Sequence, residues 1–134
     1  MHDYKRLKVW QRAQALAQTV YRESRTFTHS DSQVLRRQLC RAALGIPSSI
    51  AEGAGRSSQR EFARFLDIAA ASANEVESQL ILARDLECLK RSVANQLIQE
   101  TTEVRRMLAA LIRHARNEKE EEPASPSPPN DSDY

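Results

Sequence analysis

Apolar residues recur at three- and four-residue steps along most of this chain, in four stretches separated by short polar segments. Such spacing places the apolar side chains on one face of an α-helix. It predicts helices over about 7–25, 32–52, 59–90 and 92–116. Because each helix must bury its apolar face against a neighbour, we expect an all-α fold, an antiparallel four-helix bundle with short links.

The third stretch has the best-marked start. Ser58 and Glu61 have the spacing of a capping box, in which a serine side chain accepts an N–H group of the first helical turn. No helix-breaking residue follows until about Lys90. This stretch carries two neighbouring apolar stripes, so it should contact more than one helix and lie at the centre of the bundle.

Pro47 lies inside the second stretch, where a proline removes one backbone hydrogen bond and costs about 3 kcal/mol. The apolar spacing continues in phase to Ile50, so we expect a kink at Pro47 rather than a break. Small residues surround Pro47 and recur at 69–73. We expect these two zones to face each other at a short interaxial distance, although alanine is also simply a good helix former.

Composition divides the chain in two. Residues 1–116 form the predicted bundle, whereas 117–134 contain four of the five prolines and six of the 18 acidic residues. We expect 117–134 to be a disordered, acidic, Pro/Ser-rich tail, with the fourth helix able to extend a few residues into it. No apolar run approaches the length of a membrane span. With two cysteines and no signal-peptide pattern, the expected location is cytoplasmic.

The net charge of +2 conceals an asymmetry. Residues 1–116 hold 19 basic and 12 acidic residues, a net charge of +7, and 117–134 hold one basic and six acidic residues, a net charge of −5. Sixteen of the 20 basic residues are arginines, whose planar fork of donors suits phosphate and carboxylate. A basic body favours an anionic partner.

One motif brings a family resemblance. Residues 38–43 read Gln-Leu-Cys-Arg-Ala-Ala, and 46–53 read Ile-Pro-Ser-Ser-Ile-Ala-Glu-Gly. This pattern resembles the four-helix-bundle family named for reading frames in 23S rRNA intervening sequences, which is related to the accessory proteins of diversity-generating retroelements. Further similarity lies at 7–13, 61–75 and 107–112, whereas Gly45 and Ser49 stand where the family usually has Ser and Asn.

The resemblance implies a cytosolic bundle that assembles with itself, as a homopentamer. Retroelement accessory members are similar in having a basic pentameric barrel that binds nucleic acid and a reverse transcriptase. The sequence by itself does not give the number of subunits, because the apolar faces of one chain do not reveal the symmetry operator.

Catalytic and cofactor motifs are missing from the sequence. His2, His29 and His114 have no metal-binding spacing, and no Glu-x-x-His motif of di-iron bundles occurs. Gly53 to Arg56 lacks the sequel of a phosphate-binding loop. Cys40 lies near arginines that could lower its pKa, but a core cysteine is the favoured interpretation. We therefore expect no enzyme, no cofactor and no metal.

The arginines are the candidate binding residues. Arg56, Arg60 and Arg64 recur every four residues and so share a helix face. The full candidate set adds Arg36, Arg37, Arg105, Arg106, Arg113 and Arg116. In an oligomer these side chains would repeat and contact RNA or DNA phosphates without sequence preference. The alternative is a solvated face with local ion pairs.

A second polar group is expected to be structural. Arg41, Glu52, Ser72 and Glu75 lie within or beside the small-residue zones, and Arg41 is expected to pair with Glu75 or Glu52 across the contact of the second and third helices. The preferred function is a non-enzymatic homo-oligomeric bundle that binds nucleic acid, as accessory to an enzyme such as a reverse transcriptase. A protein-interaction scaffold without nucleic-acid binding is the alternative. The acidic tail either solubilises the chain or competes for the arginines.

Overall fold

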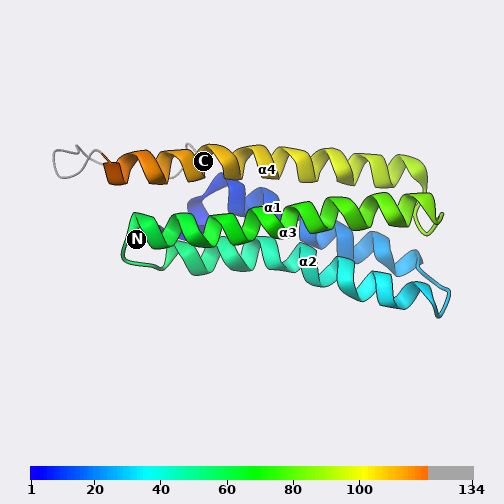
Figure 1. The fold of residues 1–134 in the computed structure, drawn as a ribbon. Helices are drawn as coiled ribbons and strands as arrows, with labels where there is room; N and C mark the ends of the chain where they lie inside the picture. Colours follow the sequence, from blue (N-terminus) through cyan, green and yellow to red (C-terminus); the bar gives the residue numbers. More distant parts are fainter. Residues whose placement is uncertain (121–134) are drawn as a thin grey trace.

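Four long helices run alternately up and down in the computed structural model, which describes residues 1–120 and the side chains of 1–117 (Figure 1). The elements are η1 (Tyr4–Arg6), α1 (Lys8–Glu23), η2 (Ser24–Thr26), α2 (Ser32–Ala54), α3 (Gln59–Asp85) and α4 (Arg91–Glu120). The most extensive contacts join α3 to both α2 and α4, and α1 closes the bundle between α2 and α4. The predicted antiparallel arrangement of four helices is thus confirmed. α3 contacts more than one helix as expected, but each of the other helices also has two neighbours, so α3 is not a central helix.

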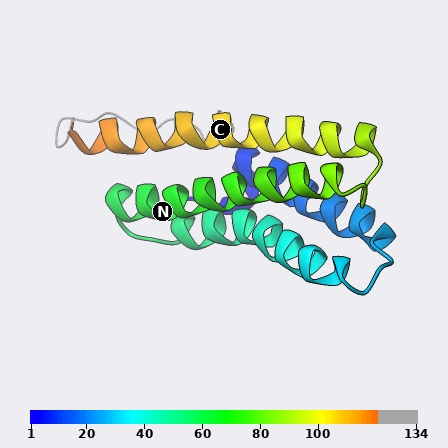
Figure 2. The same cartoon turned by 45° about the vertical axis from the view of Figure 1, so that its right-hand side comes forward.

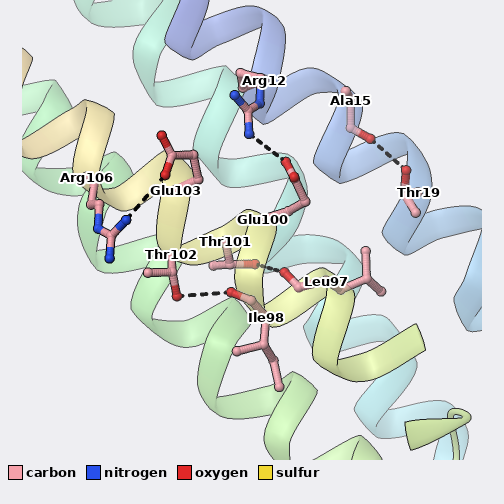
Figure 3. Close-up of polar contacts among 10 residues, drawn as sticks. All are labelled: Arg12, Ala15, Thr19, Leu97, Ile98, Glu100, Thr101, Thr102, Glu103 and Arg106. Atoms are coloured by element: carbon pink, nitrogen blue, oxygen red, sulfur yellow. Dashed lines mark hydrogen bonds and ion pairs between the residues drawn. The ribbon is translucent and has the colours of Figure 1, made fainter. Parts of the chain in front are cut away.

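The core lies where the four apolar faces meet. Its fully buried side chains include Leu7, Val9, Val20, Leu39, Ile46, Ile50, Phe62, Leu66, Val76, Leu80, Leu108 and Leu111. Thr101 is buried among them, and its hydroxyl donates to the Leu97 carbonyl at 2.7 Å (Figure 3). The Thr101 hydroxyl is therefore hydrogen-bonded within the core, which avoids the free-energy cost of burying an unpaired polar group.

The second helix is continuous through its proline. α2 extends from Ser32 to Ala54 with a buried Pro47 inside it, so the helix does not divide in two (Figure 2). The expected kink at Pro47 stays a prediction. Pro47 lies on the buried side of α2, with the fully buried Ile46 and Ile50 beside it. The apolar face of the helix therefore continues past the proline.

The small-residue zones of α2 and α3 face each other as expected. A Cβ atom added at Gly45 would lie 3.1 Å from Ser72 Oγ, and one added at Gly53 would lie 2.6 Å from Phe65 Cβ. Ala42, Ala43, Ala69 and Ala73 are buried along the same contact. The two helix backbones therefore approach so closely at Gly53 that a side chain there would collide with α3.

The start of α3 is as predicted, but its end is not. The Glu61 N–H donates to Ser58 Oγ at 3.1 Å, which is the expected cap. The helix ends at Asp85 instead of about Lys90, and Glu87 has φ of 61°. The Cys88 N–H donates to the Ala83 carbonyl at 2.8 Å and the Glu87 N–H to the Arg84 carbonyl at 3.0 Å. This is a Schellman ending with a glutamate where glycine is usual, so the sequence carried no sign of it.

The fourth helix extends beyond Ala115, its last residue that is described as buried. α4 continues to Glu120, which confirms that it extends into the tail. The rest of the predicted disordered tail lies outside the described residues. Among helices of residues 1–120, none is long and apolar enough to cross a membrane.

Replacing Gly53 by alanine should destabilise the protein by about 1–3 kcal/mol, because the new methyl group overpacks the contact with Phe65. The matched change Gly55→Ala should be neutral or stabilise slightly, since the nearest atom to its added Cβ is 3.6 Å away. Denaturant unfolding of the two variants measures the difference. Equal stabilities for Gly53→Ala and the parent chain would show that α2 and α3 can separate at no cost.

Replacing Glu87 by glycine should stabilise the protein by about 1 kcal/mol, because glycine adopts the left-handed conformation without the steric penalty of a side chain. Glu87→Ala serves as the control, since it removes the carboxylate but keeps the penalty. The same unfolding measurement applies. A loss of stability in Glu87→Gly would mean that the turn does not carry this strain.

Candidate nucleic-acid interface

The candidate arginines fall at two ends of the bundle. The α2–α3 loop, the start of α3 and the end of α4 lie together at one end, here called the α2–α3 end (Figures 1 and 2). The α1–α2 and α3–α4 loops meet at the other, the α3–α4 end, where Thr26 Oγ1 donates to the Cys88 carbonyl at 3.4 Å. Arg37 lies in α2 and Arg56 in the loop that follows it, and the 17 helical steps of α2 from Arg37 to Ala54 alone span about 26 Å. The predicted set is therefore not one continuous stripe.

Three arginines at the α2–α3 end have acidic neighbours. Arg64 Nε donates to Glu61 Oε2 at 2.8 Å, and Arg116 contacts Asp67 at 2.5 Å. Arg56 lies 3.8 Å from Glu52, at the long limit of an ion pair. The guanidinium groups of Arg56 and Arg64 also lie over the Phe65 ring, at 4.7 and 4.5 Å from its centroid. These contacts hold the two side chains in place and partly neutralise them.

Arg60, near the start of α3, and Arg113, about two turns before the end of α4, are exposed and lack a carboxylate partner within ion-pair distance among the described residues. The pKa of Glu61 is held below its ordinary value first by the hydrogen bond from Arg64, then by the charge of Arg64, and further by Arg56 and Arg60.

A hollow lies beside these groups. It has a volume of about 390 Å³ and is lined by Arg56, Ser57, Ser58, Arg60 and Phe62, together with the first residues of the chain. Two arginines and two serines therefore line one solvent-open space. Such a set of donors can accept a phosphate or carboxylate oxygen.

The arginines in the middle of α4 are engaged in ion pairs. Arg105 donates to Glu77 at 2.8 Å, and both side chains are about one-third exposed. Arg106 lies 3.6 Å from Glu103 on its own helix, and Arg12 of α1 contacts Glu100 of α4 at 2.9 Å (Figure 3). Arg105 and Arg12 thus connect neighbouring helices. The local ion-pair alternative describes these positions better than a free binding surface does.

The α3–α4 end holds more cations than the sequence analysis identified. Arg36 is half-buried and its Nε donates to Ser24 Oγ at 3.3 Å, whereas Arg37 is exposed. Four further exposed cations lie at this end: Arg22, Arg25, Lys90 and Arg91. They come from separate helix ends, so no spacing along the chain connects them. Only the antiparallel topology gathers them, and the one available signal was their position beside predicted loops.

The expected network around Arg41 does not form within one chain. Arg41, Glu52 and Glu75 are all exposed, and the carboxylate of Glu52 is next to Arg56. Within residues 1–117, no ion pair joins Arg41 to Glu52 or Glu75. Ser72 is half-buried against Gly45. The reason is helical register, because Arg41 is on the outer face of α2 rather than in its contact with α3.

Other chemistry is sparse in the described part of the chain. No group of three or more histidine, cysteine or acidic side chains there could hold a metal ion. Cys40 is buried, with its Sγ 3.4 Å from Ser24 Oγ, in keeping with a core cysteine. Both ends of the described bundle carry exposed cations beside acidic residues, such as Glu23, Asp85 and Glu87 in the hollow that Lys90 and Arg91 line, and the packed apolar core lies between the ends.

Comparison with known proteins identifies the fold and the family. A family model described as 23S rRNA-intervening sequence protein matches residues 5–110. The crystal structure of a Bacteroides thetaiotaomicron protein of unknown function from the S23 ribosomal protein family is similar, with a TM-score of 0.73 and 24% identity over 78% of this chain and 98% of that one. Comparison with curated proteins gives no match. On the strength of the family model, this chain belongs to the 23S rRNA-intervening sequence protein family.

Proposed function

We propose that this protein is a non-enzymatic, homo-oligomeric bundle of the cytoplasm that binds RNA or DNA through arginines at its two ends. The observation that carries the proposal is the exposure of Arg37, Arg60 and Arg113 without a carboxylate partner in the described chain. An unneutralised guanidinium can replace a counterion on a phosphate backbone, and the released ion drives binding. Such contacts carry no sequence preference.

The balance of paired and unpaired charges supports this assignment. Of the 19 basic residues in 1–116, seven lie within ion-pair distance of a described carboxylate. Twelve basic residues then remain against five acidic ones, so the excess of +7 sits on groups without a local partner. A surface of this sign attracts polyanions over distances up to the Debye length.

Self-association is the second part of the proposal. Large aliphatic side chains are exposed on the outer faces of α2 and α3, including Val34 at 56% and Leu82 at 47%, and Leu86, directly after α3, is exposed at 61%. Burying such side chains against another copy is favourable. A ring would repeat the arginines and make their phosphate contacts cooperative. The pentamer and a partner enzyme such as a reverse transcriptase rest on the resemblance to retroelement accessory proteins.

A protein-interaction scaffold is the second candidate. It is favoured by Arg105, Arg106 and Arg116, whose charges are already matched by Glu77, Glu103 and Asp67. In that case the same apolar surface would organise partner proteins, and the remaining arginines would serve contacts between subunits. The two candidates differ in one property, the affinity for nucleic acid.

The combined change Arg37→Gln, Arg60→Gln and Arg113→Gln should weaken binding to duplex RNA and duplex DNA alike. Each lost phosphate contact should lower the slope of log affinity against log salt by about one per chain engaged. Fluorescence anisotropy with unrelated duplexes, between about 50 and 200 mM salt, measures this slope.

A charge-balanced variant provides the matched control. Arg106→Gln with Glu103→Gln removes one cation and its own partner 3.6 Å away, so the slope should stay unchanged. Absence of salt-dependent binding by the parent chain would contradict the proposal and favour the scaffold. Equal losses in the triple variant and the control would show that the unpaired arginines have no special role.

A further inference from the structure

The fourth helix ends beside the arginines of the α2–α3 end, and the acidic residues of the sequence follow directly after it. Arg105 of α4 pairs with Glu77 of α3 at 2.8 Å, and Arg116 pairs with Asp67 at 2.5 Å. In an antiparallel pair, each step forward on α4 matches a step back on α3. Glu120 therefore lies level with about residue 63, within one turn of Arg60. Packed helices lie about 8–10 Å apart, and both ribbon views show the end of α4 beside the start of α3 (Figures 1 and 2).

The sequence that follows is purely acidic in its charges. Residues 121–134 contain Glu121, Glu122, Asp131 and Asp133 and no lysine, arginine or histidine. Fourteen residues can span at most about 50 Å, which covers the whole α2–α3 end. The α3–α4 end lies a full length of α4 away, about 45 Å, and is out of reach for all but a fully extended segment.

The receiving surface has the opposite charge and room for a chain. The hollow of about 390 Å³ presents Arg56, Arg60, Ser57 and Ser58. Arg60 and Arg113 have no carboxylate within ion-pair distance among the described residues. The pKa of Glu61 is lowered mainly by its hydrogen bond from Arg64 and the Arg64 charge, and the charges of Arg56 and Arg60 add to this in the same direction. A carboxylate of segment 121–134 would therefore find guanidinium groups that have no carboxylate partner among the described residues.

We propose that segment 121–134 docks on the Arg56, Arg60 and Arg113 surface of its own bundle and competes with nucleic-acid phosphate for it. Each exposed ion pair is weak by itself. The tether compensates, because it holds the carboxylates at an effective concentration of the order of millimolar. Docking of this kind is partial and salt-sensitive, which suits a competitor that a polyanion can displace.

The test compares the full chain with the full-length variant Glu121→Gln, Glu122→Gln, Asp131→Asn and Asp133→Asn. Arginine-specific dicarbonyl labelling, read by mass spectrometry, reports the accessibility of each guanidinium. At low salt, Arg60 and Arg113 should react about threefold faster in the variant, the change expected if two-thirds of the molecules are docked. Arg37 and Arg91, at the opposite end, should react equally in both proteins.

A matched control neutralises acids elsewhere. Asp31→Asn with Glu75→Gln removes two exposed carboxylates outside segment 121–134 and should leave Arg60 and Arg113 as they are in the parent. The difference should vanish near 1 M salt, where the Debye length falls to about 3 Å. Equal labelling of Arg60 and Arg113 in parent and tail variant would overturn docking. A uniform rise in labelling rate that includes Arg37 and Arg91 would overturn it as well, because it would indicate a general change in the electrostatic potential of the protein.

Dilution identifies whose segment is bound. Protection that persists at protein concentrations where the oligomer has dissociated supports docking on the same chain. Protection that disappears with the oligomer would overturn that assignment in favour of a neighbouring copy. Protection that returns in the tail variant on addition of inorganic phosphate confirms that the surface accepts anions.

Competition with nucleic acid rests on the proposed function and has its own readout. The tail variant should bind duplex RNA about threefold more tightly than the parent at low salt. The reason is that none of its molecules are held in the docked state, in which the RNA-binding surface is covered. If labelling shows docking and neither protein binds RNA, the proposed function fails while the docking stands. If RNA binding is salt-dependent and labelling shows no protection, docking fails while the proposed function stands.

Discussion

The close approach of α2 and α3 is the constraint on which the rest of this structure depends. At Gly53 the two backbones come so near that an added Cβ would lie 2.6 Å from Phe65, and at Gly45 only Ser72 stands opposite. Small side chains on the inner faces leave the long polar ones no place except the outer faces. Arg37, Arg41, Arg60 and Arg64 are therefore exposed, whereas Arg36 and Arg84 are half-buried. The Phe65 ring lies beneath Arg64 and beneath Arg56 of the α2–α3 loop.

Pairing then decides what each exposed arginine can do. Arg105 and Arg12 tie α4 to its neighbours through Glu77 and Glu100, so their charges serve the bundle. At the two ends the acidic residues are fewer than the basic ones, so positive charge remains on the surface of the described bundle. The same ends hold the loops, whose sequence is not constrained by helix packing. Cationic surface can accumulate there without disturbing the core.

The sequence predicted what depends on spacing within one helix, and it failed where two helices must be considered together. Stripes of apolar residues and the serine cap at Ser58 located α1, α2, α4 and the start of α3, because these signals are local. The end of α3 was missed, since Glu87 takes a conformation that sequence reasoning assigns to glycine. The pairing of Arg116 with Asp67, 49 positions away, depends on the register of α3 against α4. Gathering Arg22 and Arg91 at one end likewise requires the topology.

Protection of individual arginines by bound RNA tests the central claim most directly. Dicarbonyl labelling of the full chain, with and without a saturating RNA duplex at low salt, reports every guanidinium in one experiment. The unpaired Arg37, Arg60 and Arg113 should lose reactivity when RNA is added, while Arg105, held by Glu77, should not change. Unchanged reactivity of all three, under conditions where the duplex is bound, would contradict the account and locate the binding surface elsewhere on the bundle.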